Sequence, residues 1–338
     1  MTVNDGPAGG RYGTAVWYPS ISNLSASWDP ALIARVGKAI GEDALAIGID
    51  VVLGPGMNIQ KNVLGGRNFE YSSEDPLLTG LLMSAYVDGM QSTGTGACVK
   101  HYAANNQETA RGNVSANVSE RALREIYLKG FGLVVREAKP WTVMSAYNSL
   151  NGIHTSINRG LLTDILRGEF GFDGFVMSDW GAFGSMPDKV SAGNDLNMPG
   201  NTTDPAEVLN ALQRGTLSRG DLDTCCRNIL SVVARCAAFK GLHKGRVDQR
   251  TQSALIQEVS PDTIVLLKNE GILPIKASKK NNIIVLGPNA DLVAFGGGSG
   301  RMDPIEGRAI TLFAGLSKLG KPYSVTLMDW KSPDMAAL

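Results

Sequence analysis

The residues Gly174-Phe175-Val176-Met177-Ser178-Asp179-Trp180 form a short apolar run that ends at a carboxylate and an aromatic ring. An uninterrupted apolar run of this length is typical of a parallel strand that is buried on both faces. Four further runs share the pattern, at Ile49–Leu53, Gly96–Val99, Thr142–Ala146 and Asp195–Met198. The sequence therefore predicts a parallel β-sheet.

Signals for helix starts lie between these runs. An aspartate suited to cap a helix precedes a first-turn proline at Asp29-Pro30, Asp75-Pro76 and Asp204-Pro205. Ser218 with Asp221 resembles a capping box. Strands that alternate with helices predict βα units with right-handed crossovers, so we expect a TIM-type (β/α) barrel from Asp5 to about Lys240.

The composition changes near Gly241, where a polar stretch begins. A helix is then expected to end at Leu266-Leu267-Lys268-Asn269, and Ile283–Leu286 and Ser324–Met328 are expected to be strands. We divide the 338 residues into a (β/α) barrel at 1–242, a linker and connecting helix at 243–281, and a partial C-terminal α/β domain, the start of an α/β sandwich, at 282–338.

Charge and composition exclude several classes of protein. Lys plus Arg and Asp plus Glu both number 32, so no basic field exists to hold nucleic acid or an anionic membrane. No apolar run approaches the roughly 20 residues of a membrane span. We expect the four cysteines to be buried free thiols, at Cys98, Cys225, Cys226 and Cys236.

Two features bear on location. The first residues, Met1–Asp5, lack the basic and apolar regions of a signal peptide, which favours the cytoplasm. Four Asn-X-Ser/Thr sequons favour secretion instead, at Asn23, Asn113, Asn117 and Asn201. The location is left open, with the balance slightly toward the cytoplasm.

Polar and aromatic side chains follow the predicted strands. They are Asn58, Arg67 and Glu70 after the first run, then Lys100-His101, Tyr147-Asn148 and Asp179-Trp180, with Asp5 on the entry turn. Because the carboxyl ends of barrel strands meet at one face, we expect these side chains to converge. Such polar groups hydrogen-bond hydroxyls, and an aromatic ring covers the apolar side of a sugar. The set indicates a neutral, hydroxyl-rich ligand.

Each of these residues also has a purely structural interpretation. Asp179 could cap a helix, and Arg67 could simply form a salt bridge with Glu70. Lys100-His101 could be a buried, ion-paired strand end. What favours function is that independent loops deliver polar groups to the same rim.

A series of motifs runs nearly from end to end of the chain. They are Asp5-Gly6-Pro7 with Gly10-Arg11, Leu53-Gly54-Pro55, Gly66-Arg67-Asn68-Phe69-Glu70, Ser73-Glu74-Asp75-Pro76, Lys100-His101-Tyr102, Asn106-Gln107-Glu108, Ser119-Glu120-Arg121, Met144-Ser145-Ala146-Tyr147-Asn148, Ser178-Asp179-Trp180, Met198-Pro199-Gly200 and Leu266-Leu267-Lys268-Asn269. Together they resemble glycoside hydrolase family 3, in its β-glucosidase branch. Any one motif alone is weak, but the set is highly specific.

The resemblance implies a role for each matching residue. Asp179 is expected to be the nucleophile, with Trp180 beside the sugar ring and Tyr147 supporting the charged carboxylate. The residues expected to bind the hydroxyls of the nonreducing glucose are Asp5, Arg11, Arg67, Lys100 and His101, and Ser299 is expected to approach from the second domain. A retaining glycosidase needs an ionised carboxylate, and the neighbouring cations are expected to keep Asp179 deprotonated.

Two other branches of the family fit the sequence less well. N-acetylglucosaminidases carry a His–Asp pair in the loop after Lys-His, whereas Tyr102–Gln107 contains no histidine. β-Xylosidase-type members usually replace the tryptophan after the nucleophile, whereas Trp180 is present. The expected activity is a retaining, exo-acting β-glucosidase that hydrolyses terminal nonreducing β-D-glucosyl residues, with a β-xylosidase-type member as the alternative.

The chain departs from the family's pattern at both ends. Only four residues precede Asp5, where family members have a helix and the first barrel strand, so we expect a barrel that is incomplete at its N-terminus. Glu306 matches a structural turn, and no acid/base glutamate is found before Leu338. The acid/base is therefore unknown, and we expect activated aryl glucosides to be cleaved better than cellobiose. A catalytically impaired or non-catalytic glucoside-binding fragment is the alternative.

Other kinds of site find little support. The loop Gly296–Gly300 has neither Gly-x-Gly-x-x-Gly spacing nor a following Lys-Ser/Thr pair, so it fits no phosphate-binding fingerprint. The three histidines, His101, His154 and His243, lie far apart and predict no metal site. We expect no cofactor, a small-molecule or oligosaccharide β-glucoside as ligand, and no nucleic-acid or membrane partner; a homo-oligomer is left open.

Overall fold

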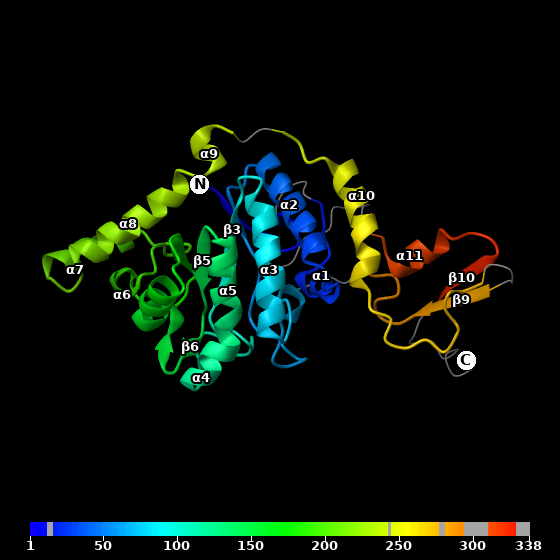
Figure 1. Cartoon of the computed structure of the whole chain (residues 1–338), viewed down its shortest axis with the longest axis horizontal. Helices are drawn as coiled ribbons and strands as arrows, with labels where there is room; N and C mark the ends of the chain where they lie inside the picture. The colour runs from blue at the N-terminus through cyan, green and yellow to red at the C-terminus, as the bar shows by residue number, and fades with distance from the viewer. Residues whose placement is uncertain (12–15, 243–244, 277–280, 294–309, 329–338) are drawn as a thin grey trace. The chain divides into compact units, whose positions relative to one another are not determined.

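The computed structural model describes residues 1–11, 16–242, 245–276, 281–293 and 310–328 (Figure 1). The chain divides into two compact units, one comprising Met1–Ile264 and the other beginning at Val265. Each unit is described by itself.

The first unit is built on a curled parallel sheet that forms part of a (β/α) barrel. Its strands follow one another in chain order: β1 (Val3–Asp5), β2 (Val51–Leu53), β3 (Gly96–Tyr102), β5 (Thr142–Ser145) and β8 (Phe175–Ser178). Every residue of β2, β3, β5 and β8 is buried, as expected for a parallel sheet covered on both faces. Strands are therefore confirmed in four of the five predicted apolar runs.

Two predictions about this sheet need correction. The run Asp195–Met198 forms no strand of its own, because only Leu196 pairs with Met177 through an isolated parallel bridge. Asp5 does not lie on a turn, because it is the last residue of β1 and pairs with Leu53 of β2. The turn begins at Gly6, which has a φ of 157°. A Cβ at this position would lie 2.2 Å from the carbonyl oxygen of Gly9, so the turn requires glycine.

Helices follow the strands, as the alternation predicted. The α-helices of the first unit are α1 (Ile21–Ala26), α2 (Pro30–Ala46), α3 (Pro76–Gln91), α4 (Glu120–Ala122), α5 (Lys129–Ala138), α6 (Met186–Ala192), α7 (Asp204–Gln213), α8 (Arg219–Val233), α9 (Ala237–Lys240) and α10 (Gln249–Val259). Two π-helical segments, Leu123–Tyr127 and Gly160–Glu169, and three 3-10 turns, Asn68–Glu70, Thr155–Ile157 and Ser260–Thr263, complete them. A small second sheet contains β4 (Ser115–Ala116), β6 (Ser149–Leu150) and β7 (Ile153–His154).

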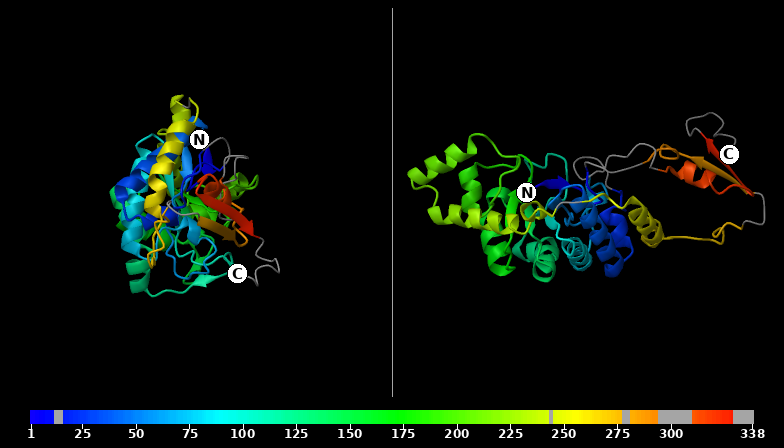
Figure 2. Two further views of the ribbon diagram at one scale, coloured as in Figure 1. Left: turned by 90° about the vertical axis from the view of Figure 1, so that its right-hand side faces the viewer. Right: turned by 90° about the horizontal axis from the view of Figure 1, so that it is seen from above.

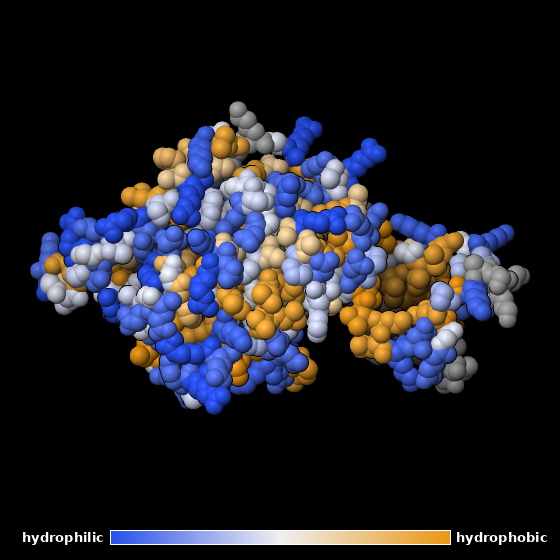
Figure 3. Space-filling model, viewed as in Figure 1, coloured by the Kyte–Doolittle hydropathy of each residue, from blue (hydrophilic) through white to orange (hydrophobic). Residues whose placement is uncertain are grey.

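Helices α2, α3 and α5 lie side by side along one face of the large sheet (Figures 1 and 2). The main hydrophobic core fills the space between them and the strands, with Ile33, Tyr86, Val99 and Phe131 almost completely buried. The outward faces of these helices are mixed, with hydrophilic side chains and apolar ones side by side (Figure 3), and Leu77 and Leu81 of α3 are about half exposed. This is the layering of a (β/α) unit, in which helices cover the outside of the parallel sheet.

The predicted helix caps are present with one exception. The carboxylate of Asp29 accepts from Ala31 and Leu32, and Asp75 and Ser218 cap α3 and α8 in the same way. Asp204 was expected to be an N-cap, but it is the first residue of α7. Its carboxylate instead accepts hydrogen bonds from the Asn197 side chain at 2.8 Å and from the backbone of Asn201 at 3.0 Å.

The second unit contains a two-stranded parallel sheet of β9 (Asn281–Leu286) and β10 (Tyr323–Met328), with α11 (Leu312–Ser317) beside β10. Both predicted strands are confirmed. The helix expected to end at residues 266–269 ends earlier, because α10 stops at Val259 and Pro261 lies in the 3-10 turn that follows. In the part of the chain that the structure describes, no helix is long and apolar enough to cross a membrane.

The four cysteines are free thiols. Cys98, Cys225 and Cys236 are buried, as expected, whereas Cys226 is exposed on α8. The prediction of burial is therefore wrong for Cys226. Its neighbour Cys225 occupies the inward face of the same helix, and adjacent positions on a helix do not share a face.

Candidate active site

A cavity of about 470 Å³ opens at the carboxyl ends of the barrel strands. It is lined by Val3, Asn4, Asp5, Arg11, Leu53, Lys100, His101, Arg111, Met144, Tyr147, Asp179 and Trp180. Most of the residues singled out in the sequence therefore meet at one place: Asp5, Arg11, Lys100, His101, Tyr147, Asp179 and Trp180. Parallel strands that end at a common edge bring together residues that are far apart along the chain.

A local irregularity in β3 places both Lys100 and His101 on the cavity. Successive residues of a regular strand point to opposite faces, so two neighbours could not both line it. Cys98 and Val99 of β3 pair regularly with Thr142 and Val143 of β5. The register then shifts between Val99 and Tyr102. Lys100 and His101 lie within this irregular segment, and both line the cavity.

Lys100 is the centre of a buried ion-pair network. Its Nζ lies 3.0 Å from Oδ1 of Asp5 and 3.8 Å from Oε2 of Glu70, and Glu70 also pairs with Nε of Arg67. Burial alone would lower the pKa of Lys100, but Asp5 and Glu70 raise it above its ordinary value. Lys100 is therefore a fixed positive charge at the cavity wall.

Asp179 lines the cavity, and its two carboxylate oxygens differ in their hydrogen-bond partners. Its Oδ1 accepts the backbone N–H of Trp180 at 2.7 Å. Its Oδ2 lies 3.6 Å from Nε2 of His101 and has no hydrogen-bond partner among the described residues, although it is buried. Buried polar atoms are nearly always paired, so an unpaired carboxylate oxygen on a cavity wall marks a place where a ligand group binds or reacts.

The pKa of the Asp179 carboxyl group is subject to opposing influences. Burial raises its pKa above the ordinary value, and Arg67, the Trp180 N–H, Lys100 and the Tyr147 hydroxyl oppose the rise. The expectation that neighbouring cations would dominate needs correction, because burial is the larger effect.

His101 is not one of the cationic neighbours that the sequence suggested. Burial lowers its pKa well below the ordinary value, and the positive charges of Arg67, Lys100 and Arg111 lower it further. A neutral imidazole therefore faces Asp179, and the contact between them is not an ion pair at neutral pH.

Tyr147 and Trp180 form the aromatic side of the site. The Tyr147 hydroxyl donates to the backbone carbonyl of Trp180 at 2.9 Å, and the indole of Trp180 remains about half exposed. The guanidinium of Arg111 lies 4.2 Å above the Tyr147 ring. A partly exposed tryptophan at a cavity rim suits contact with the apolar face of a sugar.

Two predicted residues are not among those that line the cavity. Arg67 is buried and forms the salt bridge with Glu70, and its positive charge opposes the rise in the pKa of Asp179. Ser299 lies outside the described residues. Asp179 caps no helix, because the next helix, α6, begins after Ser185 as its N-cap.

Sequence reasoning missed several residues of the site. Arg111 lines the cavity from the loop after β3, and Tyr71 hydrogen-bonds His101 from behind. Glu70 was expected near the strand ends and as a partner of Arg67, and it also lies 3.8 Å from Nζ of Lys100. Loop residues carry no periodic pattern, so nothing in the sequence placed Arg111 or Tyr71 beside the strand ends.

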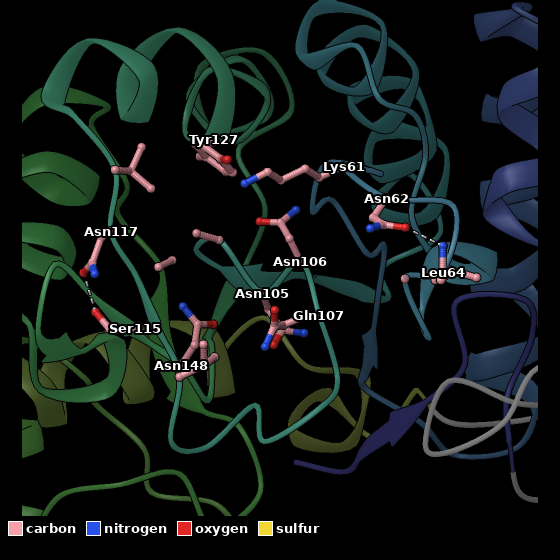
Figure 4. A pocket seen from close by; sticks show the side chains of 15 residues that line it. Lys61, Asn62, Leu64, Asn105, Asn106, Gln107, Ser115, Asn117, Tyr127 and Asn148 are labelled. Carbon is pink, nitrogen blue, oxygen red and sulfur yellow. Dashed lines mark hydrogen bonds between the residues drawn. The ribbon is translucent and has the colours of Figure 1, made fainter.

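The first unit also contains a second cavity of about 450 Å³ (Figure 4). Its wall is rich in amide side chains, which both donate and accept hydrogen bonds: Asn62, Asn105, Asn106, Gln107, Asn117 and Asn148. Asn105 connects the two cavities, because it also hydrogen-bonds Tyr71, the residue behind His101. Over the described ranges no group of three or more His, Cys, Asp or Glu is placed to hold a metal ion.

Comparison with known proteins places the chain in a family. Residues 4–232 match the glycosyl hydrolase family 3 N-terminal domain, and residues 264–332 match the glycosyl hydrolase family 3 C-terminal domain. A β-glucosidase of Rhizobium radiobacter is 42% identical over 325 residues, or 91% of this chain and 40% of the relative. An exo-α-(1→6)-L-arabinopyranosidase of Bifidobacterium longum is 42% identical over 301 residues, or 86% of this chain and 40% of the relative.

Solved structures similar to this chain are also β-glucosidases. The structure of β-glucosidase 3B from Thermotoga neapolitana in complex with glucose matches with a TM-score of 0.90 at 42% identity, over 95% of this chain and 47% of that one. The β-glucosidase of Kluyveromyces marxianus in complex with glucose matches with a TM-score of 0.89 at 36% identity, over 96% of this chain and 41% of that one. The chain thus spans about 40% of the length of the curated relatives named above. The chain belongs to glycosyl hydrolase family 3.

Proposed function

We propose that the protein is a retaining, exo-acting β-glucosidase with Asp179 as its nucleophile. The observation that carries the proposal is the unpaired Oδ2 of Asp179, buried at the wall of a cavity whose other polar groups suit sugar hydroxyls. A cavity of about 470 Å³ is of a size that takes small ligands, which suits one terminal sugar residue.

The chemistry follows from the position of that oxygen. Oδ2 attacks the anomeric carbon, and the bond from this carbon to the leaving-group oxygen breaks as a covalent glycosyl-aspartate forms. The leaving oxygen takes a proton from an acid. Water then attacks the same carbon, loses a proton to the conjugate base, and releases the sugar with its original anomeric configuration and Asp179 as a free carboxylate.

The other groups of the cavity bind the substrate in this proposal. Lys100 donates to hydroxyls, Asp5 accepts from them, and Arg11 reaches the same wall. Trp180 covers the apolar side of the ring. The positive charge of Arg67 acts from behind the wall and favours the ionised form of Asp179.

The acid/base is not assigned to a described residue. Asp5 and Glu70 are the carboxylates nearest the network, and both are paired with cations. Both side chains are held in ion pairs, with their oxygens serving as hydrogen-bond acceptors. These two residues therefore suit hydroxyl binding and charge balance better than proton donation.

A second substrate class deserves a direct test, because a relative of equal identity is named an arabinopyranosidase. Arabinopyranosides and xylopyranosides lack the hydroxymethyl group of glucose. We expect p-nitrophenyl β-D-glucopyranoside to be the better substrate, measured as kcat/KM against the α-L-arabinopyranoside and β-D-xylopyranoside. A preference for either pentoside would replace the glucosidase proposal and keep the nucleophile.

Covalent trapping separates an enzyme from a protein that only binds glucosides. Incubation with 2-deoxy-2-fluoro-β-D-glucosyl fluoride slows hydrolysis of the glycosyl-enzyme, so mass spectrometry should find one fluoroglucosyl group on the peptide that contains Asp179. The Asp179→Asn variant should stay unlabelled, and Asp164→Asn, which changes an exposed carboxyl elsewhere, should label normally. Label on another residue would overturn the assignment of the nucleophile, and no label would favour the binding-only alternative.

A further inference from the structure

A chain of hydrogen bonds leads to the face of His101 that points away from Asp179. Nη1 of Arg111 lies 2.6 Å from Oε2 of Glu108, and Nδ2 of Asn105 lies 3.0 Å from Oε1 of the same carboxylate. Nδ2 of Asn105 also lies 3.0 Å from the hydroxyl of Tyr71, and that hydroxyl lies 3.1 Å from Nδ1 of His101. Asn105, Tyr71 and His101 are almost completely buried, so solvent does not compete for these bonds.

The direction of each bond follows from what its groups are able to donate. The Glu108 carboxylate, paired with Arg111, accepts hydrogen bonds only, so the atom of Asn105 beside it must be the amide nitrogen. This nitrogen carries two hydrogens, and the second points to the Tyr71 oxygen. Tyr71 therefore accepts from Asn105 and keeps its own hydrogen for another partner.

Tyr71 keeps that hydrogen. Burial raises the pKa of the Tyr71 hydroxyl above its ordinary value, and the nearby Glu70 adds to the rise. The acceptor within reach of this hydrogen among the described residues is Nδ1 of His101, at 3.1 Å. The hydroxyl thus donates to Nδ1, which must be the unprotonated nitrogen of the ring.

The tautomer of His101 is then decided. The neutral ring carries one hydrogen, and with Nδ1 as acceptor that hydrogen sits on Nε2. Nε2 is the atom that lies 3.6 Å from the unpaired Oδ2 of Asp179. The opposite tautomer would turn a ring lone pair toward a carboxylate oxygen and leave the Tyr71 hydroxyl facing an N–H.

We propose that Tyr71 and Asn105 are positioning residues that hold His101 as its Nε2–H tautomer, so that this N–H points at Oδ2 of Asp179 or at a sugar hydroxyl bound beside it. The catalytic meaning of the relay rests on the proposed function, whereas the tautomer itself does not. Asn105 lines the amide-rich second cavity (Figure 4), so the relay links the wall of that cavity to the nucleophile.

The tautomer is measurable without any substrate and without altering the relay residues. The chain has three histidines, so ¹⁵N-histidine labelling gives three imidazole spectra, and His154→Gln together with His243→Gln identifies His101 by elimination. The expected spectrum at neutral pH shows an unprotonated Nδ1 and a protonated Nε2. A protonated Nδ1, or a doubly protonated ring, would overturn the proposal.

Two variants test the roles of the positioning residues. Tyr71→Phe removes the hydrogen that Nδ1 accepts, and should give a mixture of tautomers together with a roughly tenfold lower kcat, an effect typical of removing an orienting partner. Tyr102→Phe is the matched control, because its buried hydroxyl contacts the carbonyl of Leu161 and no histidine, and it should leave the His101 spectrum unchanged. An unaltered His101 spectrum in folded Tyr71→Phe would refute the relay.

The outcomes separate this proposal from the proposed function. An Nε2–H tautomer in a chain that neither hydrolyses nor labels would keep the relay and remove the glucosidase. Covalent labelling of Asp179 in a chain whose His101 carries its hydrogen on Nδ1 would keep the proposed glucosidase and refute the relay.

Discussion

Oδ1 of Asp179 accepts the backbone N–H of Trp180 at 2.7 Å, which leaves Oδ2 as the carboxylate oxygen without a hydrogen-bond partner among the described residues. Trp180 thus orients the carboxylate of Asp179 through its backbone N–H, independently of the indole side chain. The Trp180 carbonyl in turn accepts the Tyr147 hydroxyl at 2.9 Å. The loops after β5 and β8 are therefore joined by a hydrogen bond next to Asp179.

The first prediction concerns the side of the sugar that Asp179 attacks. Asp179→Gly should lower kcat for an aryl β-glucoside by on the order of 10⁴-fold or more, because the nucleophile is lost. Added azide should then enter the vacated space and give the α-glucosyl azide, identified by NMR. Formation of the β-azide, or turnover close to that of the unaltered chain, would contradict the assignment.

The second prediction concerns pH. Asp179 attacks only when ionised, and the Tyr147 hydroxyl lowers the pKa of Asp179 against the larger effect of burial. Tyr147→Phe should therefore raise that pKa, so a higher pH is needed for ionisation and the acidic limb of the kcat/KM profile moves to higher pH. A limb that stays in place or moves to lower pH would show that Tyr147 does not stabilise the charged form.

The third prediction concerns stability. Lys100→Met leaves the carboxylates of Asp5 and Glu70 without their shared cation in a buried place, and removal of one partner from a buried network typically costs about 3–5 kcal/mol. Urea unfolding should show this loss, and the double variant with Asp5→Asn should recover part of it. Lys38→Met is the control, since its side chain is 60% exposed and should change stability by no more than about 0.5 kcal/mol.

The fourth prediction concerns substrate binding. Arg111 lines the cavity and lies 4.2 Å above the Tyr147 ring, an arrangement worth about 0.5–1 kcal/mol at partly exposed sites. Arg111→Leu should therefore raise KM by roughly two- to fivefold with a smaller change in kcat. Arg121→Leu removes an exposed arginine that pairs with Glu125, and equal effects of the two substitutions would remove Arg111 from the site.

The fifth prediction concerns the thiols. Burial raises the pKa of Cys98 to about 12 and that of Cys236 to about 11, and Cys225 is also buried, so these three should resist a thiol reagent in the folded chain. Only Cys226 should react quickly, and unfolding in denaturant should release all four. Loss of the fast reaction in Cys226→Ser would identify the thiol, whereas several fast thiols would show that the packing around α8 and β3 is looser than described.

The sequence determined the elements that depend on local chemistry. The apolar runs predicted β3, β5 and β8, because a strand that is buried on both faces is recognisable as a nearly continuous run of apolar residues. Asp29 and Asp75 predicted helix starts, because a cap is formed by residues two or three positions apart. The position of Asp179 directly after a strand was also enough to place it at the edge where a barrel binds its ligands.

Only the tertiary structure decided the electrostatic character of the site. His101 is neutral because it is buried and surrounded by three cations that come from different segments of the chain. Lys100 and His101 both line the cavity at a register shift within β3, and the residue pattern of the strand does not predict that shift. Arg111 and Tyr71 reach the site from irregular loops, whose paths are set by long-range packing and not by periodicity. Local propensity thus fixes which residues form strands and caps, whereas charge state, side-chain direction and hydrogen-bond order depend on groups that only the folded chain brings within a few ångströms of one another.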